Sequence, residues 1–254
     1  MLMKKKMKNM MKLLSVVVGA VLLAGCGGSD SGAVKMVTDA TFPPYEYLRG
    51  QEVVGIDIEI CRAVAQKLGK EFKVENIDFD SVIPAIISSK ADLAAAGITI
   101  TEDRKKNVDF SVPYVKTGNV VIYKKATPFK DVAHLKGKRI GVQSGTTSDT
   151  YVLEQLKQEP ERFHTPPEAV AALKSGRVDF VIADVDPAKN FVKGEPDLAL
   201  SDFVTSEEYA IAIRKGRPEL LATINATIAE LKADGRLAKW IAEFTSESDK
   251  LKEK

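Results

Sequence analysis

The sequence predicts an α/β fold built as two lobes, and three observations support this prediction. From Val34 onward, short β-rich runs alternate with helical patterns, which is typical of a sheet with largely parallel strands. A second series of the same kind begins after Gly118. The two series together fill about 220 residues, enough for two lobes of about 100 residues each.

The first series predicts strands at 33–39, 71–79 and 91–101 and helices at 56–69 and 82–90. In the first helix an apolar stripe recurs at helical spacing, and it consists of Ile58, Cys61, Ala65 and Leu68. Gly69 is positioned to end this helix. In the second helix, Ser81 is placed as the cap of a first turn in which Pro84 is tolerated.

The second series predicts strands at 119–125, 138–145 and 178–184 and helices at 147–157 and 167–176. Pro167 lies near the start of its helix, and the strand at 178–184 is fully apolar in character. The runs 197–204 and 207–215 follow. Closing helices are predicted over 217–244 with a break at Gly235.

The N-terminus has the pattern of a secretory signal peptide over residues 1–25. The cationic "MLMKKKMKNMMK" precedes the apolar "LLSVVVGAVLL", which is too short to span a bilayer comfortably. "LAGC" resembles the bacterial lipobox, which implies cleavage before Cys26 and a palmitate-type lipid on its sulfur. A plain signal peptide with a chance cysteine is the alternative. Residues 26–33 have the composition of a flexible tether.

Charge and cysteine content exclude some classes of protein. The formal charge of +2 includes five lysines of the signal segment, and without them 32 basic residues face 35 acidic ones. Because these charges are interleaved, no basic patch for nucleic acid is predicted. If Cys26 is acylated, Cys61 has no partner for a disulfide within the chain, and it is predicted to be a small buried apolar residue.

Seven blocks of the sequence point to one family. They are "TDATFPPYEY", "GIDIEICRAVAQKL", "DFDSVIPAI", "DLAAAGITITEDRKKNVDFS", "GKRIGVQSGTTSD", "DFVIADVDP" and "DGRLAKWIAEF". In order and spacing they resemble family 3 of the bacterial extracellular solute-binding proteins, the amino-acid receptors of ABC importers. The resemblance covers residues 34 to about 246. Any one block alone would be weak, but together they are specific.

The resemblance implies a type II periplasmic-binding-protein-like fold whose chain crosses between the lobes near 116–119 and 206–210. Lobe 1 would comprise residues 34–116 and 210–250, and lobe 2 residues 117–209. A ligand would bind in the cleft and stabilise the closed form. The implied protein is a monomer, lipid-anchored in the periplasm or at the outer face of the cell membrane, and its partner is the permease of an ABC importer.

Arg104 is the predicted partner of the ligand carboxylate. A free amino acid loses water from its carboxylate and ammonium when a cleft shuts, so each group needs an opposite charge. The arginine fork fits a carboxylate with two parallel hydrogen bonds. If Thr101 caps a short helix, Arg104 lies in its first turn, where a cation is unfavourable and can mark a site. The family's pattern adds the backbone N–H groups of Thr99 and Thr146, the latter at a helix N-terminus.

Asp184 is the predicted partner of the ligand ammonium. The resemblance adds the carbonyl of Gly97 and the hydroxyl of Thr99 to its shell, with Ala96 beside them in the ligand site. Asp184 ends the apolar strand 178–184, so the competing interpretation is a cap for the helix that follows. Phe42 and Phe79 match aromatic residues that cover the ligand, although core packing would also explain them.

Specificity is expected of four polar residues, Asp39, Gln143, Thr147 and Ser148. Asp39 could accept from a basic or an amide side chain, so its presence does not choose between them. At position 143 a lysine would resemble the glutamine-type receptors, but this chain has Gln143. The neutral amide of Gln143 repels a cationic ligand less than a lysine would. The sequence therefore favours a basic amino acid, with arginine or lysine first and glutamine or another polar amino acid as the alternative.

Two other classes of protein compete with the binding-protein interpretation. Some relatives of the fold are cyclohexadienyl dehydratases, and Asp39 or Glu46 could be recruited as the acid or base that such chemistry needs. His134 and His164 lie outside the matched blocks and are predicted to be surface residues, and no metal-ligand or cofactor motif is visible. A sensory module would normally carry a following membrane helix, whereas this sequence ends in the polar "SESDKLKEK". A binding protein without a cofactor is therefore the prediction.

Overall fold

The computed structural model describes residues 32–251 of the 254-residue chain. The predicted signal peptide 1–25 and Cys26 lie outside the described residues. Within these, helices and strands alternate largely as the sequence predicts, and the strands form two five-stranded sheets, one three-stranded sheet and one two-stranded sheet. No helix in this part of the chain is long and apolar enough to cross a membrane.

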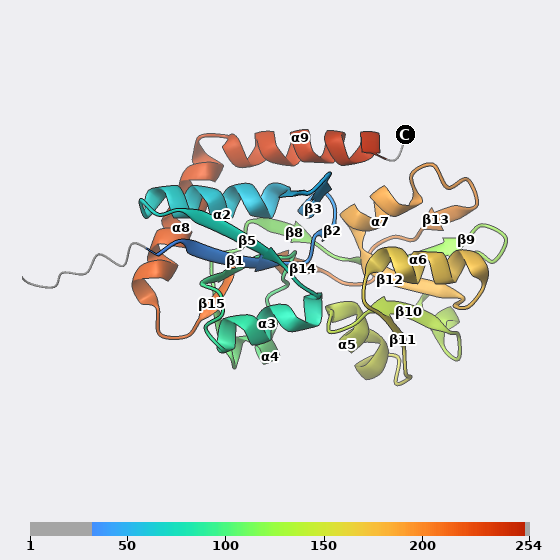
Figure 1. The fold of residues 1–254 in the computed structure, drawn as a ribbon. Helices are drawn as coiled ribbons and strands as arrows, with labels where there is room; N and C mark the ends of the chain where they lie inside the picture. Colours follow the sequence, from blue (N-terminus) through green and yellow to red (C-terminus); the bar gives the residue numbers. More distant parts are fainter. Residues whose placement is uncertain (1–31, 252–254) are drawn as a thin grey trace, which may run out of the picture. The chain divides into compact units, whose positions relative to one another are not determined.

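The elements of the first half are β1 (Val34–Thr38), β2 (Thr41–Phe42), β3 (Glu46–Arg49), β4 (Glu52–Val54), α2 (Ile56–Lys67), β5 (Phe72–Asn76), α3 (Phe79–Ile87), β6 (Leu93–Ala94), α4 (Glu102–Lys105), β7 (Val108–Phe110) and β8 (Val115–Thr117). The elements of the second half are β9 (Asn119–Lys124), η1 (Val132–Leu135), β10 (Ile140–Gln143), α5 (Thr147–Glu154), β11 (Glu161–Phe163), α6 (Pro166–Ser175), β12 (Phe180–Asp184), α7 (Val185–Val192), β13 (Leu198–Leu200), β14 (Glu207–Tyr209), β15 (Ala212–Arg214), α8 (Pro218–Ala233) and α9 (Arg236–Leu251). Figure 1 labels most of them.

The first sheet has the strand order β5-β1-β6-β15-β7, with β1 parallel to both of its neighbours. Its two faces bury different side chains because successive residues of a strand point in opposite directions. Met36 packs into a cluster with α2 and α8, and Val37 packs into another with α3. In Figure 1, α2 and α3 accordingly lie on opposite sides of β1.

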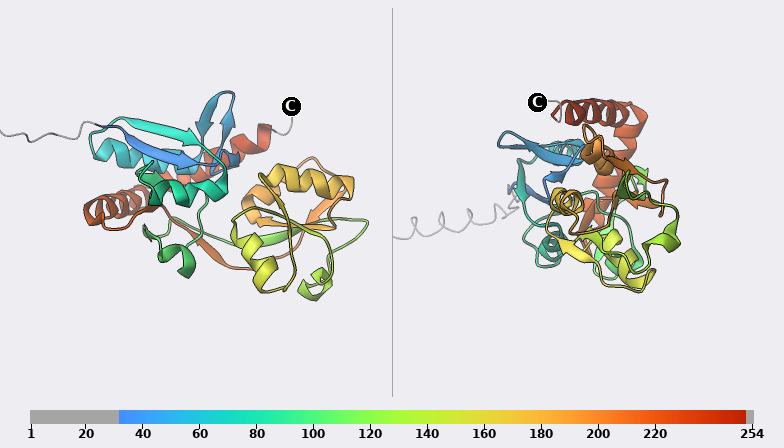
Figure 2. Two further views of the ribbon diagram at one scale, coloured as in Figure 1. Left: turned by 60° about the horizontal axis from the view of Figure 1, so that its bottom comes forward. Right: turned by 90° about the vertical axis from the view of Figure 1, so that its right-hand side faces the viewer.

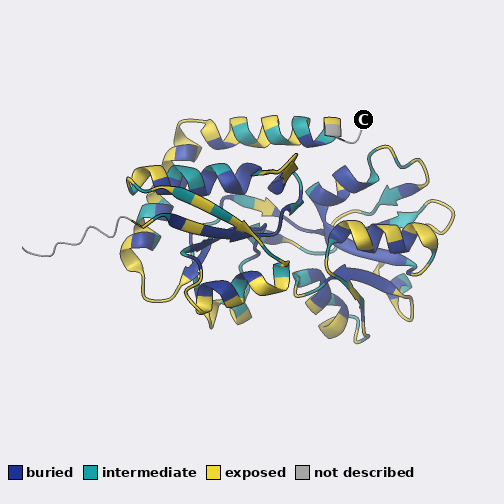
Figure 3. Ribbon diagram, in the orientation of Figure 1, coloured by how far each residue is buried: buried dark blue, intermediate teal, exposed yellow. Residues whose placement is uncertain are grey.

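The second sheet has the order β11-β10-β12-β9-β13, with β10 parallel to β11 and β12. All five residues of β12 are buried, as its apolar sequence predicts, because α5 and α6 contribute to apolar clusters on opposite faces. Figure 2 shows both sheets with their helices from two further directions. In Figure 3 the buried residues follow the strands and the inner sides of the helices.

The chain crosses between the two sheets twice. It leaves the first sheet after β7, forms β8 and enters the second sheet at β9, and it returns from β13 through β14 to β15. The crossing strands β8 and β14 pair antiparallel, with Glu207 opposite Thr117 and Tyr209 opposite Val115. Both crossings fall at the positions that the resemblance implied.

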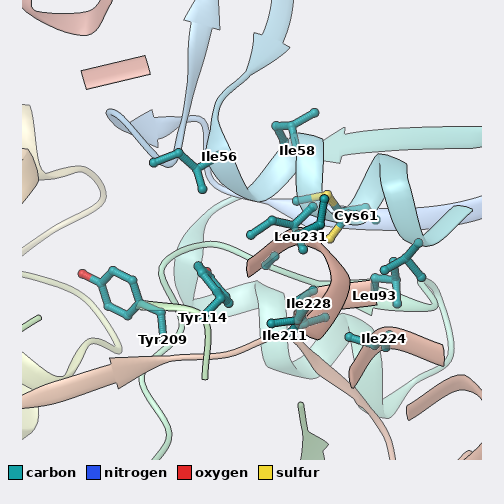
Figure 4. Close-up of a cluster of buried hydrophobic side chains, with 14 of the residues drawn as sticks. Ile56, Ile58, Cys61, Leu93, Tyr114, Tyr209, Ile211, Ile224, Ile228 and Leu231 are labelled. Carbon is teal, nitrogen blue, oxygen red and sulfur yellow. The ribbon is translucent and has the colours of Figure 1, made fainter. Parts of the chain in front are cut away.

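The helix α2 fits the apolar stripe found in the sequence. Cys61 is free and fully buried, as predicted, and Figure 4 shows it among Ile58, Leu93 and Leu231. The hydrogen bond from the Gly69 N–H to the Gln66 carbonyl closes the end of the helix.

The predicted start of α3 is wrong. The helix begins at Phe79 with Asp78 in the N-cap position, so Ser81 lies inside it and Pro84 is its sixth residue. The earlier start lets Phe79 pack against the apolar cluster below the sheet. Pro84 costs one backbone hydrogen bond, the one that its missing N–H would have donated to Asp80.

The predicted strand at 91–101 is also wrong in its second half. Only Leu93 and Ala94 pair as β6, and a single bridge joins Thr99 to Tyr209. Gly97 has φ 55°, so the backbone turns away from the extended form there. The turn converts residues 96–101 into a loop at the end of β6.

A prediction concerns Gly55, which precedes α2 with φ 138°. A Cβ atom there would lie 2.0 Å from the carbonyl oxygen of Tyr45, whereas a Cβ at Gly50, with φ 67°, would meet open space. We expect Gly50→Ala to lower the free energy of unfolding by about 1–2 kcal/mol through backbone strain alone. Gly55→Ala should cost about 1–3 kcal/mol more, because the backbone of residue 45 must move. Urea unfolding of both variants measures the difference, and equal losses would contradict the steric argument.

Candidate functional site

A narrow pocket lies where residues of the two sheets meet. It is lined by Asp39, Phe42, Glu46, Phe79, Ala96, Gly97, Thr99, Arg104, Gln143, Thr146, Thr147 and Asp184. All eleven residues predicted to bind a ligand are therefore brought together. Ser148, which was expected to contribute to specificity, lines a neighbouring hollow instead. Glu46 lines the pocket but was considered from the sequence only as a possible catalytic group.

The strand ends explain why these residues meet. Asp39 directly follows β1, Gln143 is the last residue of β10, and Asp184 is the last residue of β12. Since β10 and β12 are parallel, their carboxyl ends reach the same edge of the second sheet. Ligand sites of open α/β sheets form outside such edges.

Arg104 is oriented by the helix cap that the sequence predicts. The hydroxyl of Thr101 accepts a hydrogen bond from the N–H of Arg104, and the guanidinium donates to the carbonyl oxygens of Thr99 at 2.9 Å and Gly145 at 3.1 Å. The guanidinium carbon Cζ of Arg104 lies 5.4 Å from the ring centre of Phe79. Burial lowers the pKa of Arg104, against the opposing charges of Glu207 and Asp184. The group remains a cation with further N–H donors.

Asp184 occupies the N-cap position of α7 but makes no capping hydrogen bond with its side chain, so the cap interpretation is wrong. Its carboxylate instead accepts a hydrogen bond of 2.6 Å from the hydroxyl of Tyr209. Burial, followed by the negative charge of Glu207, raises the pKa of Asp184 to about 8, although Tyr209 and Arg104 oppose the shift. A cation in the pocket would relieve both effects.

Asp39 and Gln143 contact each other directly. The amide of Gln143 donates to Asp39 at 2.6 Å and to the carbonyl of His164 at 3.0 Å, and the hydroxyl of Thr41 donates to Asp39 at 2.9 Å. Burial raises the pKa of Asp39. Two of the four predicted specificity residues thus form one polar unit, and a polar side chain of a ligand would contact both of them.

The loop at Gly97 is held from behind. Its N–H donates to the buried carboxylate of Asp57 at 3.0 Å, and the same oxygen accepts from the hydroxyl of Tyr114 at 2.8 Å. A Cβ atom at residue 97 would lie 2.5 Å from the ring of Phe42. A glycine at this position therefore lets the aromatic ring close over the loop, while Asp57 on α2 fixes the peptide.

Glu207 was missed by sequence reasoning. It is buried on β14, and its carboxylate accepts from the hydroxyl of Thr99 at 2.5 Å, from the hydroxyl of Thr147 at 3.0 Å and from the amide of Asn119 at 2.7 Å. The hydroxyl of Thr99 is therefore a donor to Glu207, and it faces a ligand only with its acceptor side. The signal that could have found Glu207 is an acidic residue inside the predicted crossing 206–210.

Besides the bond from Thr99 to Glu207, hydrogen bonds around the pocket join residues that precede β8 to residues that follow the start of β9. They include Gln143 to Asp39, Arg104 to the carbonyl of Gly145, and the hydroxyl of Tyr45 to Asp186 at 2.8 Å. Thr146 is the N-cap residue of α5, at the helix N-terminus as predicted: its hydroxyl accepts from the N–H of Asp149 and donates to the carbonyl of Gln143.

Neither histidine belongs to the pocket. His164 is exposed, as predicted, and lies 3.9 Å from Asp78. His134 was expected at the surface as well, but its ring is half-buried against Phe180 at 5.3 Å between centres, so that prediction is wrong. The 3-10 helix that carries His134 packs over the second sheet, which explains its burial. In the described part of the chain no group of three acidic, histidine or cysteine side chains could hold a metal ion.

Residues 34–247 match the family model "Bacterial extracellular solute-binding proteins, family 3". Among curated proteins, the chain is similar to ABC transporter arginine-binding protein 1 of Escherichia coli, with 35% identity over 87% of this chain and 94% of the relative. The arginine-binding extracellular protein ArtP of Bacillus subtilis is 34% identical, with coverage of 92% and 96%. The glutamine-binding protein GlnH of the same organism is 34% identical, with coverage of 77% and 76%.

Solved structures of amino-acid-binding proteins are also similar to this chain. A mutant of the T. maritima protein ArgBP matches with a TM-score of 0.81 and 37% identity, over 85% of this chain and 96% of that one. The L-arginine complex of the amino acid ABC transporter substrate-binding protein AbpA from Streptococcus pneumoniae matches with a TM-score of 0.79 and 35% identity, with coverage of 85% and 96%. The predicted two-lobed, type II periplasmic-binding-protein-like fold is confirmed.

A second prediction follows from the raised pKa of Asp184. A carboxyl group with a pKa of about 8 in the folded protein, against 3.8 as its ordinary value, binds more protons folded than unfolded between those pH values. Stability should therefore fall as the pH rises through this window. We expect the protein without ligand to lose about 2–3 kcal/mol more between pH 6 and pH 9 than Asp184→Asn, measured by urea unfolding. The exposed carboxyl variant Asp202→Asn is the control, and it should keep the wild-type loss. A wild-type loss in Asp184→Asn would contradict the assignment.

Proposed function

Because the chain belongs to the bacterial extracellular solute-binding proteins, family 3, we propose that it is the extracytoplasmic receptor of an ABC importer for a basic L-amino acid, with arginine or lysine first. The observation that carries this proposal is a pocket in which one guanidinium and buried carboxyl groups face the same space. Relatives named for arginine support the basic ligand, and the relative named for glutamine keeps a neutral polar ligand as the alternative.

The ligand head group would bind between Arg104 and Asp184. Its carboxylate would accept from Arg104 and from the backbone N–H groups of Thr99 and Thr146, and its ammonium would donate to Asp184 and to the carbonyl of Gly97. Opposite charges on both ends offset the loss of hydration that burial imposes. The raised pKa of Asp184 supports this arrangement, since an ammonium group would stabilise the ionised carboxylate.

The ligand side chain would lie between aromatic rings. Phe42 and Phe79 would cover its aliphatic part, with Ala96 as a small neighbour that leaves room. The unit formed by Asp39 and Gln143 would receive the polar end of the side chain, with Thr147 nearby. A guanidinium or ammonium suits the carboxylate of Asp39 better than a neutral amide does, because charged hydrogen bonds are the stronger ones.

Closure of the two lobes around the ligand would make these contacts simultaneous. We propose lobe 1 as residues 34–116 and 210–250 and lobe 2 as residues 117–209, a division that the strand membership of the two sheets supports. The paired strands β8 and β14 are the connections about which the lobes would move. The ligand then shifts the population toward the closed form, since only that form offers both Arg104 and Asp184 with their partners.

Binding without catalysis, as a monomer, is part of the same proposal, because the named relatives are binding proteins of transporters. The receptor would be exported by the signal peptide 1–25 and anchored through a lipid on Cys26, with residues 26–33 as a tether. Its location would be the periplasm or the outer face of the cell membrane. The partner of the loaded receptor would be the permease of the importer.

Isothermal titration of the purified protein with each of the twenty amino acids tests the function. We expect arginine or lysine to bind with a Kd well below about 1 mM and to bind more tightly than glutamine. Arg104→Ala should weaken that binding by about 1.5–3 kcal/mol, roughly 10- to 150-fold, because a charge-assisted pair is lost.

Two further variants sharpen this test. Arg104→Lys keeps the charge without the planar fork, so its affinity should lie between wild type and Arg104→Ala. Lys105→Ala removes an exposed cation of the same helix, which pairs with Glu102, and it should bind as wild type does. Binding of no amino acid below millimolar concentration would refute the receptor, and full affinity in Arg104→Ala would refute the role of Arg104 alone.

The lipid anchor yields a separate prediction. Cells that express the full chain and grow with a radioactive fatty acid should label the wild-type protein. Cys26→Ser should abolish the label and release the protein from the membrane fraction, because the sulfur that would carry the lipid is gone. Cys61→Ser is the matched control, since Cys61 is buried, and its label should remain. Absence of label on the wild-type protein would indicate a plain signal peptide, and equal labelling of wild type and Cys26→Ser would exclude Cys26 as the lipid carrier.

A further inference from the structure

Glu46 is a buried acid of the pocket to which the proposed binding mode gives no role. It begins β3, lies among the lining residues and has no solvent exposure. No N–H or other O–H donor of the structure reaches its carboxyl oxygens, but its carboxyl group lies within hydrogen-bonding range of the carboxyl group of Asp57. Two buried carboxylates in contact repel each other, so the pair is stabilised when Glu46 carries a proton and donates it to Asp57.

The groups that face Glu46 make its ionisation harder still. Asp57 on α2, Asp39 after β1 and Asp184 at the end of β12 all act on it with negative charge, and Tyr114 and Cys61 are further titratable groups close to it. Burial, followed by the charge of Asp57, raises the pKa of Glu46 well above its usual range. Burial also raises the pKa of Asp57 itself to about 6.

The charges of the pocket are unequal. Three of its lining residues are acidic, Asp39, Glu46 and Asp184, and one is basic, Arg104. Arg104 bonds to carbonyl oxygens, and its charge acts on Asp184. A neutral amino acid brings one positive and one negative group and leaves this imbalance unchanged. A basic amino acid brings one additional positive charge, which would lower the pKa of any nearby protonated acid.

We propose that Glu46 carries a proton in the free receptor and gives it up when the cationic side chain of a basic amino acid enters the pocket. The O–H bond of the carboxyl group breaks, the electron pair stays on the carboxylate, and the proton passes to water and buffer. The released carboxylate then pairs with the ligand cation. This inference rests on the proposed function and adds to it a residue that distinguishes cationic from neutral ligands.

A test must distinguish a proton released by Glu46 from a proton released by Asp184. Asp184 would face the α-ammonium group, which every amino acid carries, so a proton released from Asp184 would appear with neutral and basic ligands alike. A proton released from Glu46 would appear only with a cationic side chain. L-arginine and L-citrulline separate the two cases, because the ureido group of citrulline has the shape of the guanidinium without its charge. A proton released from Asp39 would also appear only with a cationic side chain, because burial raises the pKa of Asp39 as well, and the variant Glu46→Gln separates these two sources.

Titration calorimetry at pH 7 in phosphate, HEPES and Tris measures proton release, because the observed heat varies with the ionisation heat of the buffer in proportion to the protons released. We expect arginine to release at least about 0.5 proton more than citrulline, whose weaker binding can be measured by displacement of arginine. We also expect the arginine affinity to rise by up to about tenfold for each pH unit and proton released. Equal release with both ligands would overturn the proposal.

Glu46→Gln is the decisive variant, because glutamine has nearly the shape of a protonated glutamate and cannot ionise. It should fold, bind arginine more weakly and lose the excess proton release, while its affinity for citrulline stays near that of wild type. The matched control Glu52→Gln removes an exposed carboxyl on β4 and should keep the full excess. An unchanged excess in Glu46→Gln would exclude Glu46 as the source. Failure of the wild type to bind any amino acid would instead overturn the proposed function itself.

Discussion

The carboxylate of Glu207 accepts hydrogen bonds from both sides of the molecule, from Thr99 beyond β6 and from Asn119 and Thr147 of the second sheet region. A buried carboxylate must be satisfied by donors, and here the donors come from elements that β14 connects. Because these donors come from both sides, the hydrogen bonds to Glu207 hold the crossing strand β14 against residues of both sheets. Two of these donors, Thr99 and Thr147, line the pocket, so the site takes its geometry from the crossing point.

Asp57 is a second buried acid that fixes part of the pocket wall, from behind the residues that line the pocket. It lies on α2, which belongs to the core of the first sheet, and it holds the N–H of Gly97 in the pocket wall. The helix is rigid because its apolar face is buried against α8. The helix α2 therefore positions the loop 96–101, which follows a strand of only two residues, β6. Buried acids, rather than the loops themselves, give the pocket its order.

The sequence predicted the elements whose signal is local. The apolar stripe of α2 and the apolar run of β12 depend on neighbours within one element, and both are found as predicted. The pocket residues were also predicted, since matched blocks and strand ends bring Asp39, Gln143 and Asp184 together. Their roles toward a ligand stay predictions.

The errors and omissions have physical causes that single segments do not reveal. Gly97 turns the backbone out of a run whose composition favours a strand, and Phe79 extends α3 beyond the cap expected from its sequence. Glu207 and its partner Thr99 lie 108 positions apart, so no local pattern relates them. From the sequence, the side chain of Asp184 could either cap the next helix or face a ligand. In the structure it accepts a hydrogen bond from the hydroxyl of Tyr209, 25 residues further along the chain, and it does not cap the helix.

The burial of Cys61 has a practical consequence for optical sensing. The full sequence contains two cysteines, and a secreted form prepared without Cys26 would retain only this thiol, enclosed by the apolar core around α2. Reagents that modify thiols require an accessible thiolate, which burial denies to Cys61. A cysteine introduced on the surface near the pocket could thus carry a fluorescent dye selectively, with no need to replace the native one. The receptor is in this respect already suited to conversion into a reporter of its ligand.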